Sequence, residues 1–230
     1  MIAAADLATY LVADAASIHG RSVAELAAAA VEGGATVVQV RGKDLSAAEL
    51  LEAVADCARR IAGRATLLVN DRVDVYLAAR ADGLPVDGVH VGQSDLPAER
   101  VRRLVGPDAV VGLSASRASE LAALRRLPAG TVDYLGVGAI RATPTKKDHP
   151  DPLGWDGFAA FVALAAEFPC VAIGGVGPGD AAAARAAGAA GLAVVRAVCA
   201  SPDPRAAAAA LRREWEDAAP VAPAEGRVRS

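Results

Sequence analysis

The stretch that decides the fold is residues 36–69, TVVQVRGKDLSAAELLEAVADCARRIAGRATLLV. Its β-branched ends predict one strand over residues 36–41 and another over residues 65–69, and its Ala- and Leu-rich centre predicts a helix over residues 46–61. A strand, a helix and a second strand in this order are typical of a parallel sheet whose helices lie outside it. The stretch therefore predicts an α/β protein.

The same strand–helix unit recurs along the rest of the chain. The other strands are predicted over residues 10–12, 88–91, 109–113, 132–137, 170–173 and 192–195. The other helices are predicted over residues 21–31, 73–80, 97–104, 118–126, 158–167, 179–187 and 204–216. Eight such units predict a single-domain (β/α)8 TIM barrel over residues 1–217, with a doubly wound open sheet as the alternative. Residues 218–230 show no periodicity and predict a disordered C-terminal tail.

Composition and charge exclude several classes of protein. With 53% hydrophobic residues the 230-residue chain is too apolar to be largely disordered, and its net charge of −3 does not suit a general nucleic-acid binder. The three cysteines stand far apart without a paired motif, which favours a reduced, cytoplasmic protein over a disulfide-linked one. The sequence shows neither a signal peptide nor an apolar run near the ~18 residues that a membrane helix needs, so we expect no membrane partner.

Residue types that are rare in this chain gather at one end of the predicted barrel. Lys occurs three times, Gln twice and Asn once. All of them lie at or just beyond the carboxyl end of a predicted strand: Gln39, Lys43, Asn70, Gln93, Lys146 and Lys147. Barrel enzymes keep their chemistry at this end, which predicts a functional site there.

Gln39, Arg41 and Lys43 occupy alternate positions at the end of the second predicted strand, so their side chains share one face. A Gln inside a barrel needs a hydrogen-bond partner. Arg and Lys on the same row suit a polyanion, because Arg binds it through a bidentate fork and Lys as a point charge. The alternative is a strand end that runs into solvent.

Asp71 and Asp95 follow the third and fourth predicted strands. Taken singly, each could cap the helix that comes after it. Neighbouring strands pair at ~4.8 Å, however, so the two carboxylates can share one hard cation. Magnesium is usually held by one or two carboxylates together with water and phosphate oxygens, and we therefore expect Mg²⁺ at this place.

Three further segments have the features of phosphate-binding loops. Residues 143–148, TPTKKD, combine hydroxyl and ammonium groups after the sixth strand. Gly174 and Gly175 follow the seventh strand, where backbone N–H groups can approach an anion closely. Val195 and Arg196 end the eighth strand, and the loops after the last two strands form the common phosphate site of barrels. Each segment alone is also typical of a solvated loop or a turn.

His90 lies between Val89 and Val91 inside a strand, and we interpret it as a hydrogen-bonded structural histidine. No Cys/His spacing indicates a zinc site. Ser114 ends the fifth strand, but no catalytic triad can be assembled around it from the sequence.

These motifs resemble those of the thiamine-phosphate synthase family. The resemblance spans residues 8–216 and rests on QVRGK at 39–43, ND at 70–71, HVGQSD at 90–95, GLSAS at 112–116, TPTKKD at 143–148 and IGGV at 173–176. It implies a Mg²⁺-assisted transferase that joins 4-amino-2-methyl-5-hydroxymethylpyrimidine diphosphate to 4-methyl-5-(2-hydroxyethyl)thiazole phosphate, or to its carboxy form. The implied products are thiamine phosphate and diphosphate. The implied mechanism is dissociative: the diphosphate leaves first, and the thiazole nitrogen then attacks the pyrimidine carbocation.

The resemblance also implies a role for each site residue. The residues implied to bind the pyrimidine diphosphate are Gln39, Arg41, Lys43, Asn70, Ser114 and Lys146. Those implied to bind the thiazole phosphate are Thr143, Thr145, Gly175, Val195 and Arg196. The metal ligands are implied to be Asp71 and Asp95.

The chain departs from many relatives on the thiazole side, where Arg196 replaces a small Ser and Arg141-Ala142 replaces an aromatic residue and Pro. One alternative function is that of a thiazole tautomerase-like isomerase on the same barrel. Such an isomerase uses a His where this chain has the Ser-Ala-Ser stretch that begins at Ser114. Another alternative is a non-catalytic binder of phosphorylated metabolites, which would not need both Asp71 and Asp95. Association into a homo-oligomer stays open.

Overall fold

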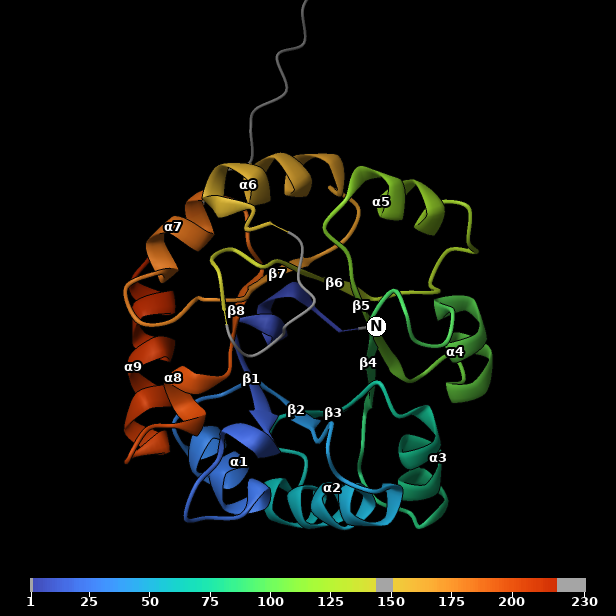
Figure 1. Ribbon diagram of the computed structural model, residues 1–230, viewed down its shortest axis with the longest axis vertical. Helices are drawn as coiled ribbons and strands as arrows, with labels where there is room; N and C mark the ends of the chain where they lie inside the picture. Colours follow the sequence, from blue (N-terminus) through green and yellow to red (C-terminus); the bar gives the residue numbers. More distant parts are fainter. Residues whose placement is uncertain (1, 144–150, 219–230) are drawn as a thin grey trace, which may run out of the picture.

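Eight parallel strands close into a barrel in the computed structural model, which describes residues 2–143 and 151–218 (Figure 1). Each strand pairs with the next, and β8 pairs with β1, so Tyr10 stands beside Ala193. The strands are β1 (Thr9–Asp14), β2 (Val37–Arg41), β3 (Thr66–Asn70), β4 (Gly88–Val91), β5 (Val110–Ser114), β6 (Tyr134–Val137), β7 (Cys170–Ile173) and β8 (Gly191–Val194). The closure confirms the predicted (β/α)8 barrel and excludes the open sheet.

The helices form a ring around the barrel, as Figure 1 shows. They are α1 (Val23–Glu32), α2 (Ala47–Ile61), α3 (Val73–Ala81), α4 (Ala98–Val105), α5 (Ala118–Leu124), α6 (Gly154–Leu164), α7 (Ala181–Ala186), α8 (Arg196–Cys199) and α9 (Pro204–Asp217). Two short 3-10 helices, η1 (Ala4–Leu7) and η2 (Ala15–Ser17), flank β1. The sequence did not predict α8, and β1 extends to Asp14, two residues beyond its predicted end. None of the helices that the structure describes is long and apolar enough to cross a membrane.

Alternation along each strand divides the apolar residues into two cores. Val38 and Val40 of β2 face the helices and are fully buried between the two layers. Gln39 lies between them in the strand and faces the barrel interior, as predicted. The strands contribute to the interior core Tyr10, Val12, Val37, Leu68, Val110, Tyr134, Val171 and Ala193.

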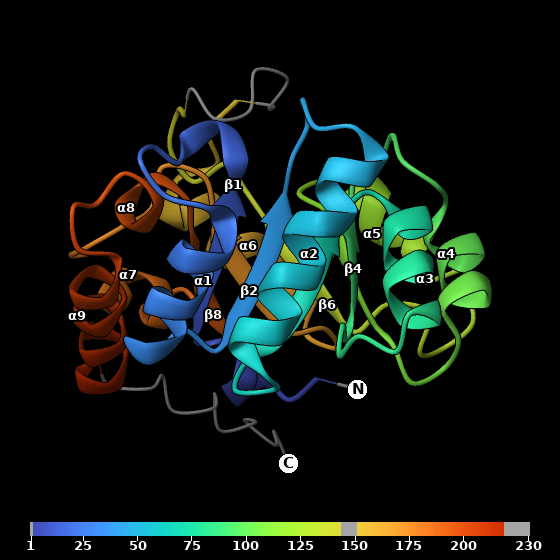
Figure 2. The same ribbon diagram turned by 90° about the horizontal axis from the view of Figure 1, so that it is seen from below.

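The N-terminal segment closes the amino-terminal end of the barrel. Ile2 and Leu7 belong to the interior core, and Leu7 is fully buried. At Gly191 of β8 the chain passes so close to this segment that a built Cβ would lie 1.8 Å from the carbonyl oxygen of Leu7. Figure 2 shows the segment below the strands. The opposite end, where the carboxyl ends of the strands meet, is left for ligands.

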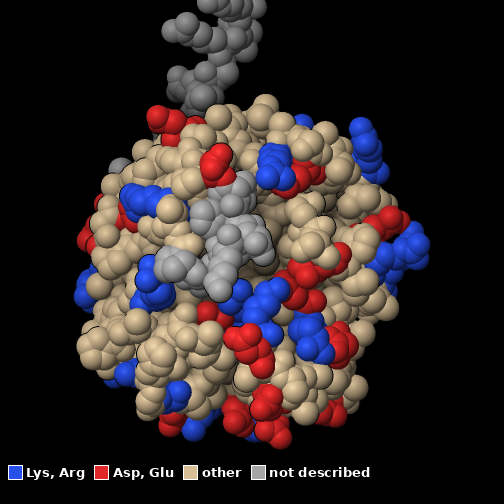
Figure 3. All heavy atoms as spheres, viewed as in Figure 1, with Lys and Arg blue, Asp and Glu red and all other residues tan. Residues whose placement is uncertain are grey.

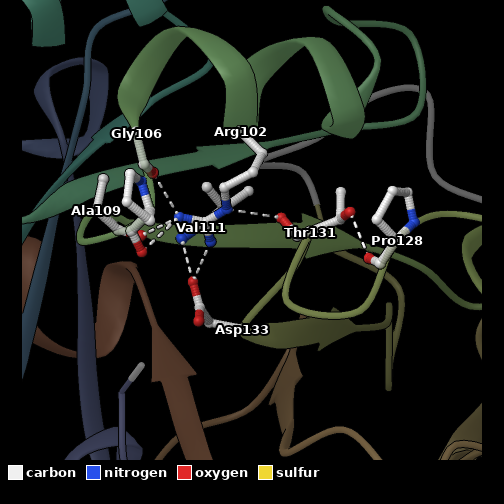
Figure 4. A network of polar contacts seen from close by, with 8 residues as sticks. Arg102, Gly106, Ala109, Val111, Pro128, Thr131 and Asp133 are labelled. Carbon is white, nitrogen blue, oxygen red and sulfur yellow. Dashed lines mark hydrogen bonds and ion pairs between the residues drawn. The ribbon is translucent and has the colours of Figure 1, made fainter.

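Arg102 of α4 ties together the loops that lead into β5 and β6 (Figure 4). Its guanidinium pairs with Asp133 at 2.6 Å and donates to the carbonyl oxygens of Ala109 at 2.6 Å and Gly106 at 2.9 Å. Asp133 also accepts a hydrogen bond from the N–H of Val111 at 2.8 Å. The side chains of this ion pair are only 14% and 8% exposed. The network therefore braces the end of the barrel opposite the cavity described below.

The predicted tail begins one residue too early. Ala218 is buried against the core that surrounds the barrel. Residues 219–230, the rest of the predicted tail, lie outside the described residues.

Candidate active site

The carboxyl ends of the strands surround one cavity of about 1700 Å³. A pocket for one drug-sized ligand has roughly 300–1000 Å³, so this cavity has room for two small substrates together. It is lined by every predicted site residue that the structure describes: Gln39, Arg41, Lys43, Asn70, Asp71, Asp95, Ser114, Thr143, Gly175, Val195 and Arg196. Thr145 and Lys146 lie outside the described residues. Figure 3 views this end and shows basic and acidic side chains close together on it.

On the β2 side, each polar side chain has a partner from β1. Gln39 is 4% exposed and its Nε2 donates a hydrogen bond to the hydroxyl of Tyr10 at 2.6 Å. Arg41 donates to Asp14 at 2.6 Å, and Asp14 also accepts from the hydroxyl of Ser17 at 2.8 Å. Sequence reasoning missed Asp14, because the first strand was predicted to end before it. The guanidinium of Arg41 is thus held at the cavity wall by a buried carboxylate.

Two carboxyl groups meet where β3 and β4 end. Lys43 Nζ lies 2.6 Å from Asp71 Oδ2, and the N–H of Gly92 donates to Asp95 Oδ2 at 2.7 Å. Burial and the neighbouring Asp71 raise the pKa of Asp95. Burial alone would also raise the pKa of Asp71, but hydrogen bonds from Lys43 and Asp95 outweigh it and lower this pKa. The two carboxyl groups are therefore electrostatically coupled, and Asp71 ionises more readily than Asp95.

The backbone at Asp71 is held in a left-handed conformation with φ of 61°. Its N–H donates to the carbonyl oxygen of His90 at 2.8 Å, which fixes the residue against the neighbouring strand. Aspartate tolerates this region better than most residues, but the conformation still costs free energy. Such a cost is typical of functional positions.

The donor set at this place fits magnesium better than zinc or calcium. The described residues contain no cluster of three or more His, Cys, Asp and Glu side chains that could hold a metal ion. Asp71 and Asp95 alone offer the one or two carboxylates by which Mg²⁺ is usually held, with waters and phosphate oxygens as its other ligands. A cation would also be attracted to this place, because the carboxyl groups of Asp14, Asp71 and Asp95 outnumber the cationic Arg41 and Lys43.

On the β7 side, the Gly174-Gly175 turn faces the cavity and is held by an ion pair. Gly174 and Gly175 have φ of 92° and 71°, and a Cβ at Gly175 would lie 2.7 Å from Cβ of Arg141. Arg141 binds Asp180 through two hydrogen bonds of 2.6 and 2.8 Å and donates to the carbonyl oxygen of Gly175 at 3.0 Å. Asp180 in turn accepts from the N–H of Gly177 at 2.9 Å. This ion pair holds the loops after β6 and β7 together, and sequence reasoning did not anticipate Asp180.

Arg196 begins the short helix α8 and lines the same cavity beside Val195. Its side chain is exposed and forms no ion pair or hydrogen bond with the described residues. Thr143 also lines the cavity. Because none of the described residues pairs with it, the Arg196 guanidinium can contact an anionic ligand here.

Hydrogen bonds fill both ring nitrogens of His90, which confirms the structural histidine. Its Nδ1 lies 2.8 Å from the hydroxyl of Tyr134, and its Nε2 lies 3.0 Å from the hydroxyl of Ser114. Gln93, one of the rare residues, donates to the carbonyl oxygen of Ser114 at 2.7 Å. Asn70 lines the cavity between β2 and β4, and none of the described residues hydrogen-bonds its side chain.

Comparisons with known proteins identify the family of the chain. Residues 9–198 match the family of thiamine monophosphate synthase. The chain is 45% identical to a thiamine-phosphate synthase of Corynebacterium efficiens over 81% of its own length and 86% of that protein, and 46% identical to one of Chloroflexus aurantiacus over 90% and 92%.

A solved structure of a thiamine phosphate pyrophosphorylase from Pyrococcus furiosus superimposes with a TM-score of 0.79 at 29% identity, over 93% of this chain and 97% of that one. Orotidine 5'-phosphate decarboxylase from Pyrococcus horikoshii, at 16% identity and a TM-score of 0.60, shares the fold alone. Because the family match covers most of the chain and the relatives exceed 40% identity, the chain belongs to the thiamine monophosphate synthase family and is a transferase of thiamine biosynthesis.

Proposed function

We propose that the chain joins 4-amino-2-methyl-5-hydroxymethylpyrimidine diphosphate to 4-methyl-5-(2-hydroxyethyl)thiazole phosphate, or to its carboxy form. The observation that carries the proposal is the arrangement of Lys43 against the paired Asp71 and Asp95. A binder of phosphorylated metabolites needs cations, but it does not need two carboxyl groups forced together beside them. A metal-assisted departure of diphosphate needs both.

The diphosphate side comprises the ends of β2, β3 and β4. Arg41 is pre-oriented by Asp14, and half-exposed Lys43 reaches over Asp71. When a diphosphate enters, these two cations contact its oxygens and stabilise the negative charge that grows as the C–O bond breaks. Asn70 and Lys146 are proposed to complete this side.

Asp71 and Asp95 would hold the Mg²⁺ ion. When bound, the ion would supply Lewis-acid stabilisation of the departing diphosphate. Asp71 keeps its contact with Lys43, so that the carboxylate aligns the ammonium group as well. We propose Gln39 and Ser114 as the residues that orient the pyrimidine ring.

The thiazole phosphate is proposed to bind at the β7 and β8 ends. The Gly174-Gly175 turn presents its backbone there, and Arg196 adds a cation without a protein partner among the described residues. Thr143 and Thr145 would supply hydroxyl groups, and Val195 its backbone. A guanidinium that contacts the phosphate directly would replace the small hydroxyl of many relatives, through charge-assisted bonds of roughly 1.5–3 kcal/mol.

The chemistry is a substitution at the pyrimidine methylene carbon. The C–O bond to diphosphate breaks, and the diphosphate leaves with the bonding electrons. The lone pair of the thiazole nitrogen then forms the new C–N bond. No proton moves in either step with 4-methyl-5-(2-hydroxyethyl)thiazole phosphate, so the protein needs no general base, and its task is alignment and charge stabilisation. With the carboxy form, the carboxyl group also leaves as CO2 after the C–N bond forms, and the ring carbon that carried it takes up a proton from water. A tautomerase would need the proton-transfer group that is replaced here by Ser114.

The direct test is incubation of the purified chain with both phosphorylated precursors, with Mg²⁺ and in chelated buffer, followed by mass spectrometry of the products. We expect thiamine phosphate only when both precursors and Mg²⁺ are present. Controls omit each precursor in turn. Rearrangement of the thiazole phosphate without condensation would favour a tautomerase, and binding without any product would favour the non-catalytic alternative.

A further inference from the structure

Five polar side chains form a continuous chain of hydrogen bonds across the inside of the barrel. Gln39 Nε2 donates to the hydroxyl of Tyr10 at 2.6 Å, and the hydroxyl oxygens of Tyr10 and Tyr134 are 2.7 Å apart. The hydroxyl of Tyr134 lies 2.8 Å from Nδ1 of His90, whose Nε2 lies 3.0 Å from the hydroxyl of Ser114. All five residues line the cavity. The proposed function uses only the two ends, Gln39 and Ser114.

Glycines in the neighbouring strands leave space for these hydrogen-bonded side chains. A Cβ built on Gly112 of β5 would lie 2.3 Å from the hydroxyl oxygen of Tyr134 and 2.4 Å from Nδ1 of His90. A Cβ on Gly136 of β6 would lie 3.0 Å from Cε1 of His90. Glycine inside a strand often marks such a close approach. Any side chain at Gly112 would displace the contact between Tyr134 and His90.

The hydrogen bonds between these five side chains all donate in one direction, and the amide of Gln39 sets this direction. An amide nitrogen can only donate, so the hydroxyl of Tyr10 accepts this bond and has its own proton to place. Tyr10 is 2% exposed, and its other partner among the described residues is Tyr134. If the Tyr10 proton did not go to Tyr134, it would be buried without an acceptor, which is costly.

The direction of the hydrogen bonds continues from Tyr134 to His90. Burial raises the pKa of Tyr10 and Tyr134 well above the ordinary value, so both keep their protons. The oxygen of Tyr134 accepts from Tyr10, and its proton goes to Nδ1 of His90. His90 therefore carries its proton on Nε2 and donates it to the oxygen of Ser114. The proton of Ser114 is then left for the cavity.

We propose that Tyr10, Tyr134 and His90 are positioning residues between the two ends of the pyrimidine site. Their hydrogen bonds all donate in the same direction, and we call this row of hydrogen bonds the relay. The relay holds Gln39 so that its Oε1 faces the cavity as an acceptor, and it holds Ser114 so that its hydroxyl faces the cavity as a donor. Its importance for turnover rests on the proposed function, which assigns both ends to the pyrimidine substrate.

The orientation of Gln39 is consistent with an Oε1 that is not buried without a partner. Among the described residues, only Thr9 has a fully buried side-chain oxygen without a hydrogen-bond partner, so Oε1 of Gln39 is not such an atom. No hydrogen bond from the described residues reaches Oε1 of Gln39, so this oxygen is open to the cavity. The cavity thus offers an acceptor from β2 and a donor from β5. An aminopyrimidine carries the matching pair, an amino group that donates and a ring nitrogen that accepts.

The protonation site of His90 reports the direction of the whole relay. If the amide of Gln39 were turned by 180°, every bond would reverse, and His90 would carry its proton on Nδ1. Long-range ¹H–¹⁵N NMR of the full chain, labelled in histidine and kept at mildly alkaline pH, distinguishes the two nitrogens. Exposed His19 serves as the internal reference, and the His90→Gln variant identifies the His90 signals. We expect a protonated Nε2 and an unprotonated, hydrogen-bonded Nδ1; a proton on Nδ1 overturns the proposal.

Two matched variants test the links of the relay, since Tyr134→Phe and Tyr10→Phe each delete one buried hydroxyl from the same cluster. In Tyr134→Phe the Nδ1 signal of His90 should move to the position of an unbonded nitrogen. In Tyr10→Phe it should stay, because Tyr134 still donates to His90. An Nδ1 signal that stays in Tyr134→Phe, or that moves equally in both variants, contradicts the relay.

Kinetics supply the second measurement. Each variant loses one ordering hydrogen bond and should raise the KM for the pyrimidine diphosphate about fivefold, while the KM for the thiazole phosphate stays within about twofold. An equal rise in both KM values would show general damage rather than positioning. The NMR result needs no turnover, so an inactive wild-type chain would refute the proposed function and leave the relay to be decided by the His90 signals.

Discussion

Replacing Arg102 by Met should destabilise the barrel without impairing its site. Removing one partner of a buried ion pair costs about 3–5 kcal/mol. Arg102 and Asp133 keep a little exposure, 14% and 8%, and Asp133 retains the N–H of Val111, so we take the lower end, about 3 kcal/mol. For a domain of this size, each kcal/mol lowers Tm by roughly 2–4 °C, which gives about 6–12 °C.

The neighbouring Arg103 provides the matched control. It lies in the same helix and pairs with Glu99, but their side chains are 63% and 36% exposed, so Arg103→Met should cost at most about 0.5 kcal/mol. Thermal and urea unfolding followed by circular dichroism measure both variants. Because Arg102 lies at the end opposite the cavity, kcat at a temperature where both variants are folded should equal that of the wild type. Equal Tm losses in the two variants, or a selective loss of kcat in Arg102→Met, would contradict a purely stabilising role of the buried ion pair.

Further predictions concern the cavity. Asp71→Ala and Asp95→Ala should each abolish most turnover and weaken Mg²⁺-dependent binding of diphosphate, measured by calorimetry; full activity of both in chelated buffer would contradict the metal assignment. Lys43→Ala should lower kcat by about 10²-fold, or ~2.7 kcal/mol, with little change in Tm because the side chain is half exposed. Arg41→Ala should lower kcat similarly but also lower Tm, since it leaves a buried carboxylate unpaired. Arg196→Ser should raise the KM for the thiazole phosphate alone, and a rise confined to the pyrimidine KM would place the two pockets the other way round.

Much of the fold could be predicted from the sequence, because strands and helices differ in period and composition over long stretches. The helix predicted over residues 46–61 begins at a capping box, in which Ser46 and Glu49 bond each other's backbone, and the observed α2 agrees within one residue. The short helix α8 was missed because the four residues Arg196–Cys199 are too few to show a period. The closure of the barrel by Ile2 and Leu7 was not predicted, because no sequence motif near these residues indicates that apolar residues before the first strand pack under the barrel.

Some residues of the site could likewise be predicted from the sequence, and others could not. Lys43, Asp71 and Asp95 could be found from sequence because each follows a strand, and the ends of parallel strands meet at one edge. Asp14 and Asp180 could not, because their roles depend on arginines 27 and 39 residues away in sequence. The relay through Tyr10 and Tyr134 was hidden for another reason: aromatic residues in strands are typical of core packing, and only the closed barrel brings their hydroxyls together.

We expect one end of the barrel to hold both anionic substrates and to release diphosphate as the thiamine skeleton forms. The most direct measurement is a single-turnover time course by ³¹P NMR with enzyme in excess over both precursors. We expect free diphosphate and thiamine phosphate to appear in equal amounts when Mg²⁺ is present, neither to appear in chelated buffer, and Asp71→Ala to form only a small fraction of each. Equal turnover without a divalent cation, or phosphorus signals that stay those of the two precursors in the presence of Mg²⁺, would contradict it.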